Sequence, residues 1–115
     1  NVIIKIDKMR IFQVLQNIIS NSLKYTVNGG ISVDFAVYDN ELVISIKDSG
    51  KGIAATDIPF VFDKFYRGEK ARTMNAAGSG LGLNISRYIV NKHGGEIECD
   101  SILDKGTTIS FSLPI

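Results

Sequence analysis

The chain has 115 residues, of which 44% are hydrophobic and 22% are charged. This is the size of one domain with a single core, and the composition excludes intrinsic disorder. Thirteen Lys and Arg against 12 Asp and Glu give a net charge of +1, which gives no support for a nucleic-acid-binding protein or a basic membrane peptide. The single cysteine, Cys99, excludes an internal disulfide and a multi-cysteine metal site and favours a reducing compartment. A first residue other than methionine, with no signal-like segment, indicates a domain cut from a longer protein.

The first half of the chain predicts a strand, a long helix and a β-hairpin. The β-branched run 2–6 predicts a short strand. Asp7 stands where an N-cap belongs, ahead of apolar residues at helical spacing over residues 8–25. Residues 31–38 and 42–47 alternate between apolar and polar, which predicts two strands joined by a tight turn.

The second half predicts two more helices and two more strands. A short helix is expected over residues 57–64 and a second long helix from about Leu81, which the glycines at 94–95 end. Residues 96–101 and 107–113 predict the last two strands, with a glycine turn between them.

This order of elements predicts an α+β fold in two layers. Strands that are neighbours in sequence pair, and the helices must cover one face of the sheet. We therefore expect a mixed sheet of about five strands, covered on one face by about three helices. Residues 66–80 have little periodicity and are expected to form a mobile loop, because structureless loops of that length in compact domains are usually functional.

The first predicted helix carries a polar row beside its apolar face. Asn17, Asn21 and Lys24 recur at i, i+4 and i+7 and therefore share a face. An amide oxygen is a hard ligand for Mg²⁺, and an ammonium group neutralises phosphate charge. The alternative is an ordinary solvated face, although asparagine is a poor helix former and an unusual choice for one.

A glycine-containing turn, Asp48-Ser49-Gly50-Lys51-Gly52-Ile53, directly follows a predicted strand. A carboxylate there can accept a hydrogen bond from an exocyclic amine, and glycines allow a flat ring to approach the backbone. The turn lacks the lysine-bearing phosphate loop, which excludes a Walker site. The alternative is a simple tight turn.

Two further segments favour phosphate binding. Four positively charged side chains fall within nine residues, where they could close on a triphosphate: Lys64, Arg67, Lys70 and Arg72. The alternative is an ordinary solvated loop that is rich in charge. The glycine run 78–83 opens the second long helix and exposes backbone N–H groups to an anion. Its G-x-G-x-G spacing, with no strand directly before it, excludes a dinucleotide-binding fingerprint.

Together, in this order and spacing, the segments resemble the catalytic ATP-binding domain of sensor histidine kinases, in the superfamily shared with gyrase, Hsp90 and MutL. Residues 16–25 resemble the N box of that family, 48–53 the first glycine box, 62–67 the F box and 78–83 the second glycine box. The resemblance covers essentially the whole chain and implies the Bergerat α/β sandwich with a mobile ATP lid.

The resemblance also implies roles for individual residues. Asn21 would be the side-chain ligand of Mg²⁺, and Asp48 would accept from the adenine N6 amine. Asn17, Lys24 and Arg67 would form the catalytic set near the phosphates. The other implied nucleotide contacts are Tyr25, Gly50, Gly52, Ile53, Phe65, Gly80, Leu81, Gly82, Leu83 and Thr107.

One position separates this sequence from the related ATPases. Gyrase-like enzymes carry a glutamate one helical turn before the metal-binding asparagine, to activate water, and here that position is Asn17. An amide has no useful basicity near pH 7, so we expect transfer of the γ-phosphoryl group to an external nucleophile. In the family this is a histidine on a separate dimerisation helix. The only histidine here, His93, is expected to be structural because it ends a helix.

The resemblance therefore implies a protein-histidine kinase domain that uses ATP and Mg²⁺. Its expected partners are the dimerisation domain of the same kinase and a response regulator, with no nucleic acid. We expect this fragment to be monomeric and cytoplasmic, within a homodimeric and membrane-anchored parent. The alternatives are an ATP-driven conformational ATPase, an anti-sigma serine kinase and a non-catalytic scaffold. Acid-labile phosphohistidine would distinguish a histidine kinase from a serine kinase, because phosphoserine is stable in acid.

Overall fold

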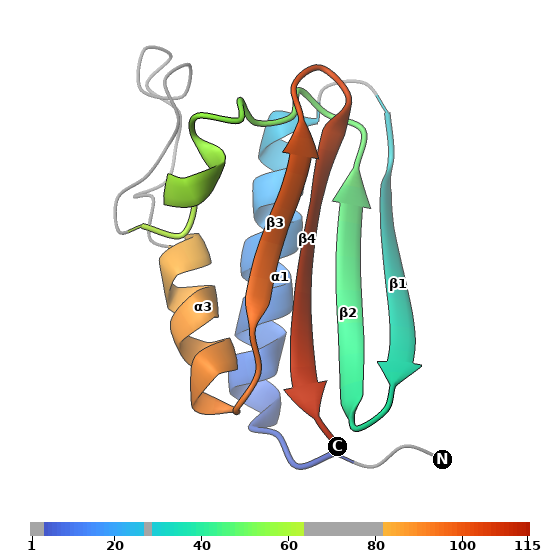
Figure 1. Cartoon of the computed structure of the whole chain (residues 1–115), viewed down its shortest axis with the longest axis vertical. Coiled ribbons are helices and arrows are strands. Elements are labelled where there is room, and N and C mark those ends of the chain that lie inside the picture. The colour runs from blue at the N-terminus through green and yellow to red at the C-terminus, as the bar shows by residue number, and fades with distance from the viewer. Residues whose placement is uncertain (1–3, 27–28, 64–81) are drawn as a thin grey trace.

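The computed structural model describes residues 4–26, 29–63 and 82–115, and Figure 1 shows their arrangement. In chain order the elements are α1 (Lys8–Tyr25), β1 (Ile31–Tyr38), β2 (Glu41–Asp48), the 3₁₀ helix η1 (Ile58–Phe60), α3 (Gly82–Lys92), β3 (Ile97–Ile102) and β4 (Gly106–Pro114). Both α-helices lie on the same side of one sheet (Figure 1).

The sheet has four strands in the order β1-β2-β4-β3, and every neighbouring pair is antiparallel. The central pair joins β2 to β4, which follow one another in space but not in sequence. Their register places Asp48, at the end of β2, opposite Thr107, near the start of β4. Figure 1 shows the carboxyl end of α1 at this same end of the molecule.

Helix α1 forms where the sequence predicts it. The side chain of Asp7 caps it by accepting a hydrogen bond from the backbone N–H of Arg10 at 3.2 Å. Ile11, Val14 and Ile18 recur at i, i+3 and i+7 and are buried in the core. One face of α1 is therefore fixed against the sheet and against α3.

The core lies between the helices and the two central strands. Alternate residues of β2 and β4 point into it, with Ile44 opposite Phe111 and Ile46 opposite Ile109. Each of these four side chains is at most 4% exposed. The neighbouring positions along each strand face away from the helices, which gives the half-buried alternation that the sequence shows.

Most predicted elements are confirmed, some with small shifts of their ends. The first helix has the predicted bounds, the hairpin forms from β1 and β2, and the second long helix begins at Gly82. That helix ends before Gly94, whose φ of +82° allows the chain to turn back. The last two predicted strands correspond to β3 and β4.

Three expectations about the fold are wrong within the described residues. The α+β class is confirmed, but the described sheet has four strands, all antiparallel, where a mixed sheet of about five strands was expected; two α-helices and one 3₁₀ helix accompany it. Residues 4–6 are not a strand: Ile4 and Ile6 instead pack against the core as irregular chain. The helix expected over 57–64 is the single turn Ile58–Phe60, with Pro59 in its first turn; its predicted end lies outside the described residues. The loop predicted over 66–80 also lies outside them.

Among the described helices, none has the length and apolar character needed to cross a bilayer.

The core predicts a large difference between two phenylalanines on the helix-facing side of the sheet. Phe111 is 1% exposed and Phe35 is 65% exposed. We expect Phe111→Ala to lower the free energy of unfolding by about 3–5 kcal/mol, because it removes a buried ring and leaves a cavity. Phe35→Ala is the matched control and should cost less than about 1 kcal/mol. Urea denaturation measures both, and equal losses would contradict the core described here.

Candidate functional site

The turn after β2 presents a buried carboxylate in a fixed orientation. Asp48 is 7% exposed, and its Oδ1 accepts a hydrogen bond from the backbone N–H of Gly50 at 2.9 Å. An ionised carboxylate has about four acceptor positions. One backbone N–H orients the group and leaves it with capacity to accept from a ligand.

Two glycines allow the surrounding backbone to pack closely around Asp48. Gly52 has φ +71° and Gly106 has φ +131°, which side-chain-bearing residues rarely adopt. A Cβ at Gly52 would overlap the carbonyl of Ile102, and a Cβ at Gly106 would overlap the carbonyl of Asp48. The glycine turn therefore lies directly against the connection between β3 and β4.

A serine that the sequence analysis did not identify joins these segments. The Oγ of Ser101, on β3, accepts from the N–H of Ile53 at 2.7 Å and donates to the carbonyl of Gly106 at 2.8 Å. It also lies 2.8 Å from the Oγ1 of Thr107, which is 9% exposed. Five of the implied nucleotide contacts therefore lie together at this end of the sheet: Asp48, Gly50, Gly52, Ile53 and Thr107.

A second polar group connects the two helices. The Nδ2 of Asn17 donates to the carbonyl of Gly82 at 3.2 Å and to the Oγ of Ser86 at 3.4 Å. Ser86 is fully buried and donates back to the carbonyl of Gly82 at 2.9 Å. The amide nitrogen of Asn17 thus holds the first residue of α3 against α1.

The other residues of the polar row lie one and two turns further along α1. Asn21 is half-buried and Lys24 is exposed, both in the carboxyl-terminal part of the helix. Leu83, which was assigned to nucleotide contact, has its side chain in the core. The remaining assigned side chains or residues lie outside what the structure describes: the Tyr25 side chain, Phe65, Arg67, Gly80 and Leu81.

The described residues on either side of 64–81 are also tied together. The Nδ2 of Asn84, on α3, donates to the carbonyl of Phe62 at 3.1 Å. The guanidinium of Arg87 lies 5.8 Å from the centre of the Phe62 ring, a cation–π contact. Sequence reasoning missed both residues of α3, because nothing in their spacing indicates that Phe62 packs there.

The imidazole of His93 is hydrogen-bonded through both ring nitrogens at the end of α3. Its Nδ1 lies 2.9 Å from the carbonyl of Ile89, which can only accept, so Nδ1 carries the proton. Its Nε2 accepts from the backbone N–H of Asp7 at 3.0 Å. Both ring nitrogens are therefore engaged, which agrees with a structural role.

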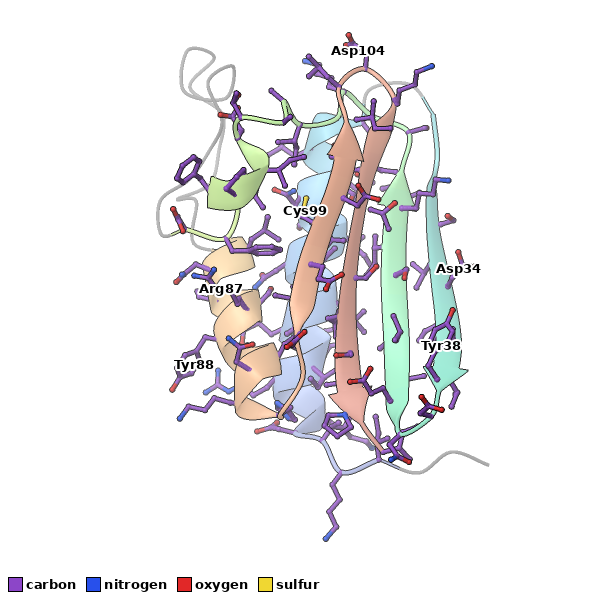
Figure 2. All side chains as sticks on the ribbon, viewed as in Figure 1. Asp34, Tyr38, Arg87, Tyr88, Cys99 and Asp104 are labelled. Carbon is purple, nitrogen blue, oxygen red and sulfur yellow. The ribbon has the colours of Figure 1, made fainter. Side chains whose placement is uncertain are left out.

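The single cysteine, Cys99, lies two residues before Ser101 on β3. Figure 2 shows Cys99 on β3, and its side chain is half-buried against the core. Burial raises the pKa of the thiol to about 11, and the negative charges of Asp100 and Asp48 add to the effect.

This raised pKa predicts slow alkylation of Cys99. Because the thiolate is the nucleophile and its formation is disfavoured, the reaction rate should rise through about pH 11 and not through about pH 9. Iodoacetamide labelling followed by mass spectrometry measures the profile, with the urea-unfolded chain as the control. A native midpoint at or below that of the unfolded chain would contradict the buried position of Cys99.

The comparisons with known proteins agree with this arrangement. The family model described as "Histidine kinase-, DNA gyrase B-, and HSP90-like ATPase" matches residues 6–115. The chain belongs to this family. It is a catalytic domain of the sensor histidine kinase type.

The relatives support that placement. Sensor histidine kinase WalK of Bacillus subtilis is 52% identical over 96% of this chain. The nucleotide-free catalytic domain of the histidine kinase ThkA superposes with a TM-score of 0.80 at 29% identity, over 96% of this chain and 71% of that one. Full-length ShkA in complex with AMPPNP gives a TM-score of 0.82 at 28% identity, over 94% of this chain and 22% of that one. The chain spans 19% of the length of WalK, about a fifth of that curated relative.

Proposed function

We propose that this domain binds Mg-ATP and donates the γ-phosphoryl group to a histidine on the dimerisation domain of its parent kinase, for relay to a response regulator. The observation that carries the proposal is the oriented carboxylate of Asp48 in a close-packed glycine turn, within a member of this ATPase family. The bound AMPPNP of ShkA, an ATP analogue, supports the same choice of ligand.

The base of the nucleotide is proposed to lie at the β2–β4 end of the sheet. Asp48 and Thr107 are directly opposite in register and both are buried, so they present oxygen atoms side by side. Gly50, Gly52 and Ile53 would form the backbone surface next to the base. A carboxylate acceptor favours the exocyclic amine of adenine over the carbonyl of guanine.

The phosphates are proposed to lie along α1, near the start of α3. Asn21 would supply one amide oxygen to Mg²⁺, and this ion usually keeps several waters and takes phosphate oxygens as its other ligands. The described residues contain no cluster of three or more His, Cys, Asp or Glu side chains, which suits a metal held mainly by its substrate. When bound, Mg²⁺ neutralises charge on the phosphates. Lys24 and Arg67 would add positive charge, and Gly80, Leu81, Gly82 and Leu83 would contribute backbone.

The residue in the general-base position of related ATPases favours transfer over hydrolysis. The amide nitrogen of Asn17 is occupied with the carbonyl of Gly82, and an amide cannot take a proton from water near pH 7. The domain would thus position and shield ATP, while an external histidine attacks the γ-phosphorus. Because the chain spans a fifth of WalK, the acceptor and the dimer contacts are proposed to lie elsewhere in the longer protein.

The adenine assignment predicts the effect of Asp48→Asn. The substitution replaces a charged acceptor with a neutral amide and should weaken Mg-ADP binding by about 1.5–3 kcal/mol, or about one to two orders of magnitude in Kd. Isothermal titration calorimetry measures this change. Asp34→Asn, at an exposed position on β1, is the matched control and should leave Kd unchanged. An unaltered Kd for Asp48→Asn would remove this residue from the adenine role.

The metal assignment predicts that Asn21→Ala abolishes Mg²⁺-dependent phosphotransfer while the domain stays folded. The assay adds labelled ATP, Mg²⁺ and a separately made dimerisation domain, and follows acid-labile label on the added domain. Gln16→Ala, at an exposed position of the same helix, is the control and should retain transfer. Retained transfer by Asn21→Ala would refute the metal role. Acid-stable label would support a serine kinase, and free phosphate without label would support an ATPase.

A further inference from the structure

Ser101 and Thr107 form the last side-chain pair before the turn that joins β3 to β4. They are directly opposite in the antiparallel register, and Thr107 is in turn opposite Asp48 on β2. Residues opposite one another share a face of the sheet. The carboxylate and the two hydroxyl groups therefore lie in one row across three strands.

The hydrogen bonds of Ser101 fix the direction of each hydroxyl hydrogen. A serine hydroxyl has one hydrogen and two acceptor lone pairs. The carbonyl of Gly106 can only accept, so it takes the hydrogen of Ser101, and the N–H of Ile53 can only donate, so it uses one lone pair. The contact of 2.8 Å between Ser101 and Thr107 then requires Thr107 to donate its hydrogen to the second lone pair.

Thr107 can therefore offer only lone pairs to a ligand. Asp48 beside it is also an acceptor, with one oxygen already oriented by Gly50. Two adjacent acceptors suit the 6-amino group of adenine, which has two N–H donors, whether they meet it directly or through a water. They disfavour the 6-oxo group of hypoxanthine or guanine, because an acceptor there would face acceptors.

We propose that Ser101 is a positioning residue for base selection: by taking the hydroxyl hydrogen of Thr107, it holds that side chain as an acceptor and favours adenine over 6-oxopurines. The proposal rests on the proposed nucleotide-binding function, and deepens it by adding a residue outside the base contacts assigned above. Ser101 acts through Thr107. Its N–H partner, Ile53, ends the glycine turn after β2, and its carbonyl partner, Gly106, begins β4.

The test compares two variants of equal size. Ser101→Thr keeps a hydroxyl at this position, whereas Ser101→Val replaces it with a methyl group. Calorimetric titrations with Mg-ADP and Mg-IDP give two dissociation constants for each protein. We expect Ser101→Val to reduce the preference for ADP over IDP by about three- to tenfold, the range of one neutral hydrogen bond. Ser101→Thr should keep the preference of the unaltered domain.

A second background tests whether the effect passes through Thr107. In a Thr107→Val domain the hydroxyl that Ser101 orients is gone, so Ser101→Val should no longer change the ADP-to-IDP ratio. Thermal unfolding of each variant verifies that the domain is folded at the titration temperature.

Two results would overturn the proposal without touching the proposed function. One is an equal loss of affinity for both nucleotides in Ser101→Val, which would give Ser101 a structural role only. The other is an unchanged effect of Ser101→Val in the Thr107→Val background. If the unaltered domain binds neither nucleotide at millimolar concentration, the proposed function itself fails, and this proposal fails with it.

Discussion

The pairing of β2 with β4 is the constraint on which the rest of the molecule depends. It brings Ile44 and Ile46 opposite Phe111 and Ile109, so the same register builds the core and places Asp48 opposite Thr107. Because side chains alternate along a strand, a slip by one residue would turn Ile46 outward and Lys47 inward. The free-energy cost of exposing these buried apolar side chains therefore also maintains the alignment of Asp48, Thr107 and Ser101 across the strands. The stability of the core and the geometry of the candidate site are specified by one set of backbone hydrogen bonds.

Much of the secondary structure could be predicted because its signals are local. Helix α1 has an N-cap and a regular apolar spacing, and the β1–β2 hairpin has a tight turn between alternating strands. The arrangement of the sheet is not local, since β4 inserts between β2 and β3 and its partner β2 is far away in sequence. The β-branched run at the start of the chain shows the limit of propensity. The side chains of Ile4 and Ile6 are partly buried against the core, although residues 4–6 do not pair in a strand.

The candidate site shows the same division between local and tertiary information. The resemblance to a known family identified Asp48 and Thr107 from short motifs, and the register places them opposite each other. Ser101 and Asn84 were missed because each bonds a backbone group that is distant in sequence. Ser86 was missed because its side-chain partner, Asn17, lies on the other helix. Ser101 had one available signal: it ends one predicted strand and Thr107 begins the next, so a hairpin between the two strands places these residues opposite each other. The direction of the hydroxyl hydrogens, in contrast, depends on the hydrogen bond from the N–H of Ile53, which is distant in sequence.

The imidazole at the end of α3 has a practical consequence for any phosphotransfer measurement. His93 is the only histidine in the sequence, and both of its ring nitrogens are occupied by backbone groups of Asp7 and Ile89. A nucleophilic nitrogen needs a free lone pair, and here that lone pair already holds the loop that leads into α1. The folded domain thus offers no unoccupied imidazole nitrogen. Phosphohistidine formed in a mixture with another protein is therefore expected on that protein, whereas phosphoramidate on lysine or arginine is assigned only after the two chains are separated.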